Sequence, residues 1–322
     1  MRFPHLDGRV KKLSIALDLA PDKAEWLAAA ALHSGCFLRT QYRNYSRHTE
    51  VAANKFAQRL IDQNLTIEVP VKNLGLLARI TGKKIYRVLG AADSRHRRLA
   101  SWPIMHRRLL SLDYVLDHPE LSWLPTEAEK VNCFDALETP RNEIPSRVYG
   151  GAANRTVRYF ANKHPIAVDR NNKTAVFVYV DSEERTTKGL ESWRDEHAAL
   201  WSRLCRLGFR LNIVHAGSNS SLSGKVEKSF RIWHLSTSPS ASPEEIRAEL
   251  DELRRAFETG DDAALDPYGG LNEALRMSFD LKQRLERSAA NTGYEADYRV
   301  WVSQRVLPRG AHRNPLGPRA RE

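Results

Sequence analysis

The chain has 322 residues, which is long enough for at least two domains, and a content of 42% hydrophobic and 28% charged residues argues against global disorder. Its net charge of +11 favours a polyanionic partner, with nucleic acid as the first candidate and a membrane surface as the weaker one. No stretch approaches the roughly 18 consecutive apolar residues of a membrane-spanning helix, so no membrane partner is expected.

The N-terminal residues and the cysteines indicate the compartment. The start leads into a short amphipathic segment, Val10–Leu19, rather than into the apolar core of a signal peptide, so we expect a cytoplasmic protein. The three cysteines, Cys36, Cys133 and Cys205, are far apart and form no paired motif. Neither a disulfide framework nor a zinc site is therefore expected, and no cofactor is assigned.

A helix-turn-helix pattern follows. Apolar spacing predicts a helix over Asp22–Ser34 that Gly35 ends, and a second, short helix that opens at Phe37. Thr49 is a suitable N-cap for a third helix, Glu50–Gln63. The inward positions of this helix are expected to be Val51, Phe56, Leu60 and Ile61.

The period then changes from helical to alternating. Leu65–Pro70 is expected to form a strand, Val71–Leu76 a turn and Ala78–Leu89 a return strand, with Lys72, Lys83 and Lys84 near the tip. Three helices followed by a hairpin predict a winged helix. In helix-turn-helix proteins the second helix of the motif enters the major groove, so Glu50–Gln63 is the expected recognition helix and the hairpin is expected on the flanking minor groove or backbone.

Residues of the types that contact DNA are concentrated in this region. Asn, Gln and Arg read base edges, whereas Lys and Arg neutralise phosphates. The expected DNA-binding residues are Arg39, Arg43, Arg47, His48, Asn54, Lys55, Gln58, Arg59, Lys72, Lys83, Lys84, Arg95, Arg97 and Arg98. The last three form a basic junction. Phosphate contacts and a solvated helix start are equally good interpretations of it. A protein-interaction module with a solvated charged face remains the alternative for the whole region.

The region after residue 95 alternates between strand and helix patterns. Short strands are expected at Val148-Tyr149 and Thr156–Ala161, and stronger strands at Ile166–Asp169, Thr174–Val180 and Phe209–His215, with a helix over Leu190–Leu207. This order predicts a compact mixed sheet with helices against it.

The last part is expected to be a helical extension. A linker, Thr237–Ala241, precedes a helix capped by Ser242, and a further helix spans Leu271–Ala289. Tyr298–Leu307 fits a strand and a last helix equally, and the basic tail after Pro308 reads as disordered. The expected domains are 1–94, 95–236 and 237–322.

Two carboxylates at strand ends raise the question of catalysis. Asp169 and Asp181, followed by Glu183, are similar to the acidic residues that bind Mg²⁺ in restriction-endonuclease-type nucleases. The Lys expected two positions after the second acid is absent, and strand-end carboxylates are often solvated loop residues. We therefore expect a nuclease-like fold without nuclease chemistry, and keep a Mg²⁺-dependent nuclease as the alternative.

The order of these features resembles a known family. A winged helix (Phe37–Leu89), a basic junction, His106-Arg107-Arg108 on a helix, and a strand ending in Val180-Asp181 with Thr186-Thr187 after it are similar to the replication-relaxation winged-helix proteins of plasmids and integrative elements. The sequence departs from that family at Ile166–Asp169, where a Pro-Asp pair is more usual, and after Ser236.

The resemblance implies an α+β protein of a bacterial mobile element. Its winged helix would be joined to a degenerate nuclease-like sheet, and it would act in replication, transfer or transcriptional control. We expect a sequence-specific double-stranded DNA-binding protein that works as a homodimer. A role without catalysis is favoured over an enzymatic one.

Overall fold

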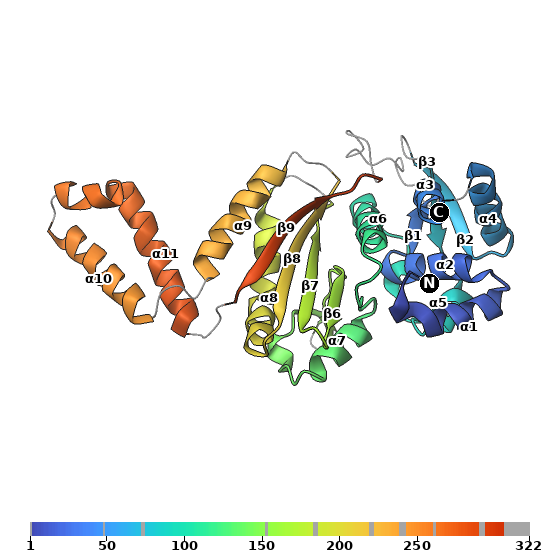
Figure 1. The fold of residues 1–322 in the computed structure, drawn as a ribbon, viewed down its shortest axis with the longest axis horizontal. Helices are drawn as coiled ribbons and strands as arrows, with labels where there is room; N and C mark the ends of the chain where they lie inside the picture. The colour runs from blue at the N-terminus through green and yellow to red at the C-terminus, as the bar shows by residue number, and fades with distance from the viewer. Residues whose placement is uncertain are drawn as a thin grey trace.

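The chain is a mixed α/β protein of three parts, of which the third is inserted into the second. The computed structural model describes residues 2–47, 49–71, 75–151, 154–182, 186–218, 222–237, 243–259, 262–289 and 294–305. In Figure 1 an N-terminal unit lies at one end, a sheet with its helices lies in the middle, and the helices α10 and α11 extend at the other end.

The N-terminal unit combines five α-helices with a three-stranded antiparallel sheet. Its elements are η1 (Pro4–Leu6), α1 (Asp7–Leu17), α2 (Pro21–His33), β1 (Cys36–Leu38), α3 (Arg39–Ser46), α4 (Glu50–Asp62), β2 (Thr66–Val71), β3 (Gly75–Ile80) and α5 (Lys83–Val88). The strand order is β1-β3-β2. Gly35 joins α2 to β1 at φ +74°, and a Cβ there would lie 2.5 Å from the Cβ of His96, so this turn requires glycine.

Two boundaries in this unit differ from the expected ones. Phe37 does not open a helix: β1 is a fully buried strand paired with β3, and the helix begins at Arg39. The expected return strand Ala78–Leu89 is wrong as well, because β3 ends at Ile80 and α5 follows Gly82. Lys83 and Lys84 therefore lie on α5, at the end of β3 that is remote from the β2–β3 turn.

The central part is a four-stranded sheet between two layers of helix. The order is β6 (Ile166–Asp169), β7 (Thr174–Val180), β8 (Arg210–Gly217) and β9 (Ala296–Val302). β6 runs antiparallel to β7, and the other pairs are parallel. α8 (Lys188–Arg206) and α9 (Ser223–Thr237) pack on one face, whereas α6 (Trp102–Asp117) packs on the other. The remaining elements before the sheet are η2 (Arg95–Arg97), α7 (Glu127–Asp135), η3 (Arg141–Glu143) and the hairpin of β4 (Ser146–Tyr149) and β5 (Thr156–Tyr159).

The hydrophobic core is continuous from the N-terminal unit to the sheet. One cluster of buried side chains includes Leu27 of α2, Leu109 of α6, and Val178 and Val214 of the sheet. Alternate residues of β7, such as Phe177, face the second cluster under α8 and α9. The expected boundary at residue 94 thus separates two sets of elements that share one core through α6.

The expected C-terminal division also needs correction. α10 (Pro243–Glu258), η6 (Asp262–Tyr268) and α11 (Leu271–Ala289) form a helical hairpin with its own small core, as expected for helices in this region. However, β9 returns to the central sheet, so the hairpin is inserted between α9 and β9. The expected basic tail and Ser242 lie outside the described residues.

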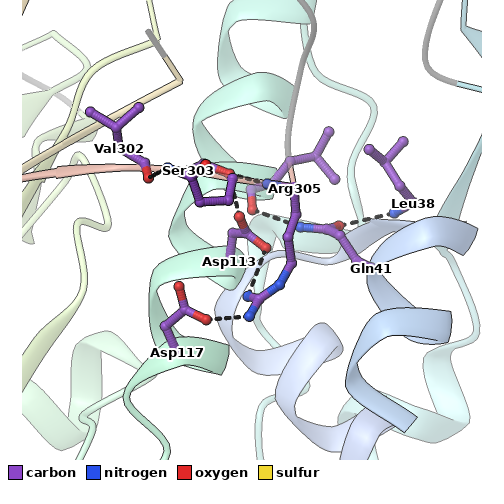
Figure 2. Close-up of polar contacts among 9 residues, drawn as sticks. Leu38, Gln41, Asp113, Asp117, Val302, Ser303 and Arg305 are labelled. Carbon is purple, nitrogen blue, oxygen red and sulfur yellow. Dashed lines mark hydrogen bonds and ion pairs between the residues drawn. The ribbon is translucent and has the colours of Figure 1, made fainter. Parts of the chain in front are cut away.

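A buried carboxylate fastens the end of β9 to α6. Asp113 of α6 accepts hydrogen bonds from the Ser303 hydroxyl and from Arg305, whose Nη1 lies 3.3 Å from Oδ1 (Figure 2). Arg305 also pairs with Asp117, one turn further along α6. Close to this contact, Gln41 of α3 donates to the Leu109 carbonyl of α6 at 3.1 Å. The sheet and the N-terminal unit are therefore both hydrogen-bonded to α6.

None of the described helices is both long enough and apolar enough to cross a membrane.

Candidate functional site

The outer surface of α3 and α4 carries polar side chains that the core does not use. Arg43 and Asn44 of α3 are exposed, as are Lys55 and Gln58 of α4, and Asn54 is half-buried between them. α4 begins where expected because Thr49 accepts a hydrogen bond from the Ala52 amide at 3.4 Å. These residues form a continuous polar face on two consecutive helices.

One apolar residue belongs to the same face. Val51 was expected to point into the core, but its side chain is 64% exposed. The inner side of α4 is made instead by Ala53, Phe56, Ala57 and Leu60. A methyl-bearing side chain is therefore presented to the outside at the first turn of this helix.

Arg39 is fixed inside the N-terminal unit and is not part of a free basic surface. Its Nε donates to Oε1 of Glu68 in β2 at 2.6 Å, and its Nη1 donates to Oδ1 of Asn54 at 2.9 Å. Arg39 thus links α3, α4 and β2. Because the Asn54 oxygen is engaged by Arg39, the other end of this amide is a hydrogen-bond donor.

Arg59 also differs from its expected place. It donates to the Asp18 carbonyl at 2.6 Å and to the Asp18 carboxylate at 3.2 Å, so it faces the connection between α1 and α2. Arg43 lies 3.7 Å from Glu50, both largely exposed, which is a weak surface pair. Arg47 is exposed after α3. His48 and Lys72 lie outside the described residues.

The basic junction lines a cleft that the sequence analysis missed. Arg95 and His96 border a cavity of about 540 Å³, together with Lys130 of α7 and the segment Phe160–Lys163 that follows β5. Arg95 and Arg98 are exposed, and Arg97 is half-buried. The residues of this cleft come from distant parts of the sequence, and only the folded chain brings them together.

Two lysines in the cleft have unusual proton affinities. Lys130 is 4% exposed, and its ammonium donates to the His164 carbonyl at 2.6 Å. Burial, reinforced by the charge of Lys163, lowers the pKa of Lys130 to about 7. Burial and the neighbouring Arg108 lower the pKa of Lys163 to about 8. The pKa values of Arg107 and Arg108 are lowered as well, mainly by burial.

The two carboxylates considered for catalysis lie at opposite ends of β7. Asp169 pairs with Thr174, the first residue of β7, whereas Asp181 follows its last residue. At about 3.3 Å per residue this separates them by roughly 23 Å, too far to share one metal ion. Glu183 lies outside the described residues, and within the described ranges no group of three or more His, Cys, Asp or Glu is arranged to hold a metal ion.

Each carboxylate has a local role of its own. Asp169 is half-buried and accepts from the amides of Asn171 at 2.9 Å and Asn172 at 3.0 Å, and hydrogen bonds from Asn172 lower its pKa. It therefore stabilises the β6–β7 turn. Asp181 is buried, and its Oδ2 lies 3.4 Å from Nε2 of His215.

The chain was compared with protein-family models, with curated proteins and with solved structures, and no match was found in any of the three comparisons.

Proposed function

We propose that this protein is a sequence-specific double-stranded DNA-binding protein whose N-terminal unit acts as a winged helix. The order α2, β1, α3, α4, β2 and β3 agrees with that architecture, in which α4 is the recognition helix and the β2–β3 hairpin is the wing. The observation that carries the proposal is the outward face of α4, where Val51, Lys55 and Gln58 are exposed next to Asn54.

The chemistry of this face suits base edges in the major groove. Gln58 and Asn54 match adenine, Lys55 matches guanine or a phosphate, and the Val51 methyl groups match the methyl group of thymine. Arg43 and Arg47 would neutralise phosphates beside the groove. Arg39 would act indirectly, by orienting Asn54 for contact with a base.

The experiment that tests this proposal is a binding titration over a salt series. The full-length protein is mixed with duplexes from its own gene neighbourhood, with random duplex as competitor. We expect a complex that survives the competitor, and whose log affinity falls linearly with log salt concentration. Binding that random DNA removes completely would contradict sequence-specific recognition.

For the biological role we propose a protein of a bacterial mobile element, of the replication-relaxation type, that acts in transcriptional control or in plasmid replication and transfer. The supporting observation is the order of its parts, with the α3–α4 face followed by the basic junction Arg95–Arg98 and then by a sheet whose strand β7 ends at Asp181. A metal-dependent nuclease is not proposed, because Asp169 and Asp181 lie at opposite ends of β7.

We further propose that a second copy of this chain is the partner. One winged helix covers only on the order of 600–1,000 Å² of DNA, so a single copy has a small interface. The outer side of α11 carries a row of apolar side chains one turn apart, Leu271, Leu275 and Phe279, which are 51%, 53% and 62% exposed. Pairing of two such rows would bury them and place two recognition helices in one particle.

Phe279→Asp should convert this dimer to a monomer. Burying a Phe contributes about 1.5–3 kcal/mol, and two copies are lost per dimer, so the dimer dissociation constant should rise by roughly 100-fold or more. Sedimentation velocity over a concentration series measures this. Arg247→Asp, on the exposed surface of α10, is the control and should leave the dimer intact. A wild-type protein that sediments as a monomer at every concentration would remove the basis for the dimer.

A further inference from the structure

Several cavities surround the segment Phe160–His164 between β5 and β6, and three of them are of substantial volume. The cavity of about 540 Å³ and a smaller one of about 160 Å³ are both lined by Lys163, and the smaller one shares Asn162 with a third cavity of about 300 Å³. Phe160 and Lys163 have φ values of +48° and +57°. Such backbone conformations are costly for residues other than glycine, and they are concentrated at functional sites.

Five cations that line these cavities form no ion pair with any acid of the described residues. They are Arg95, Arg107, Arg108, Lys130 and Lys163. No ion pair joins any of them to an acid within the part of the chain that the structure describes, whereas Arg141, Arg147 and Arg158 nearby each pair with one. Glu127, an acid of the largest cavity, is already held by the Tyr159 amide at 2.9 Å and by Arg158 at 3.5 Å.

In the protein without a ligand, this arrangement of positive charges is unfavourable in free energy. Lys130 is almost completely buried and donates only to the His164 carbonyl among the described residues, so the nearby charges of Glu129 and Glu127 offset its burial only in part. The charge of Lys163 adds repulsion at Lys130, and the charge of Arg108 adds repulsion at Lys163, which agrees with the lowered pKa values of the two lysines. An anion in the largest of these three cavities, which Arg95, Lys130 and Lys163 line, would relieve both the desolvation and the repulsion.

We propose that this cleft binds the phosphate group of a small ligand of mononucleotide size. Arg and Lys clusters recognise phosphate by charge and by hydrogen bonds. A volume of about 540 Å³ lies within the range of small-molecule sites and is too confined for a duplex. Tyr149, Tyr159 and Phe160 line the same cavity and supply aromatic surface for a ring attached to the phosphate. The proposal stands on the cleft alone and is independent of the DNA-binding proposal.

The test is isothermal titration calorimetry of the full-length protein with ATP, AMP and inorganic phosphate as probes. We expect the wild type to bind at least one probe, and Lys163→Gln to weaken that affinity by about 10-fold. Arg95→Gln, a change at an exposed residue, should weaken it by roughly 3- to 10-fold and is the variant to use if Lys163→Gln does not fold. Lys228→Gln on the exposed side of α9 is the matched control and should bind as the wild type does.

Proton uptake gives a second readout. A bound anion favours the charged forms of Lys130 and Lys163, whose pKa values in the free protein are about 7 and about 8. Binding at pH 8 should therefore take up protons, measured as a difference in heat between two buffers of unequal ionisation enthalpy. At pH 6 both lysines are already charged and take up no further protons, so the exchange there comes from the phosphate of the probe, whose second pKa is about 6. Affinity should fall as the pH rises from 7 to 9.

Two results would overturn the proposal. One is an absence of binding by all three probes, or binding that neither Lys163→Gln nor Arg95→Gln changes. The other is displacement of the probe by duplex DNA together with an equal loss of duplex affinity in Lys163→Gln, which would make the cleft a contact for the DNA backbone. Lys55→Glu separates this proposal from the DNA-binding one, because it should change duplex affinity and leave probe binding intact.

Discussion

Lys55→Glu should weaken binding of the protein to its specific duplex by about 100-fold. Lys55 is exposed on the outer face of α4, between Val51 and Gln58. Reversal of its charge removes a favourable contact with a base or a phosphate and places a carboxylate against the polyanion. Fluorescence anisotropy with a labelled duplex at fixed salt measures the change, and circular dichroism checks that α4 remains folded.

Lys84→Glu is the matched control for this prediction. The sequence pattern placed Lys84 at the tip of the hairpin, where a reversal would harm DNA binding. The structure places it on α5, away from the β2–β3 turn, so we expect at most about a threefold change. Equal losses for the two variants would indicate non-specific attraction to the whole basic protein, and the assignment of α4 as the recognition helix would fail.

Asp113→Ala should lower the free energy of unfolding by about 3–5 kcal/mol. The Asp113 carboxylate is fully buried and holds both the Ser303 hydroxyl and Arg305. Its removal leaves a buried hydroxyl without this acceptor and a partly buried guanidinium with one carboxylate fewer, which costs far more than the loss of a surface pair. Urea denaturation followed by tryptophan fluorescence measures the change.

Asp117→Ala supplies the comparison, because it truncates the other carboxylate of Arg305. Its side chain is 29% exposed, so water replaces the lost contact and the loss should be about 1 kcal/mol or less. Similar losses for the two variants would show that the burial of Asp113 adds little to the attachment of β9. A loss confined to Asp113→Ala would identify this residue as the fastening point between the last strand and α6.

The elements that the sequence predicted correctly are those whose own residues decide the conformation. β7 is a run of β-branched and apolar residues, and it spans the expected Thr174–Val180. α11 has a clear helical period and spans the expected Leu271–Ala289. β1 was missed because three residues carry too little pattern, and pairing with β3 decides their conformation. Val51 was misplaced because Ala53 and Ala57, small residues that give a weak apolar signal, form the inner side of α4.

The same distinction applies to the residues of the candidate sites. Asn54, Lys55 and Gln58 follow from the period of one helix, so their common face was predictable. The interactions of Arg39 and Arg59 inside the N-terminal unit were not, because Glu68 and Asp18 come from other elements. The cleft depends on residues between Arg95 and Lys163 that meet only after α6, α7 and β5 have packed. The pattern of residues along the chain does not show which distant residues such packing brings together.

The late position of β9 in the chain has a consequence for biosynthesis. Leu211 of β8 pairs with Ala296, which is 85 residues later in the sequence. At roughly 5–20 residues per second, a ribosome needs on the order of 4–17 seconds to make that segment. During this time β8 has an unpaired edge that includes Ile213 and Val214, while the local contacts of α10 and α11 can already form. A nascent chain at this stage exposes the kind of open strand edge that pairs with other chains, and only the arrival of β9 covers that edge of β8.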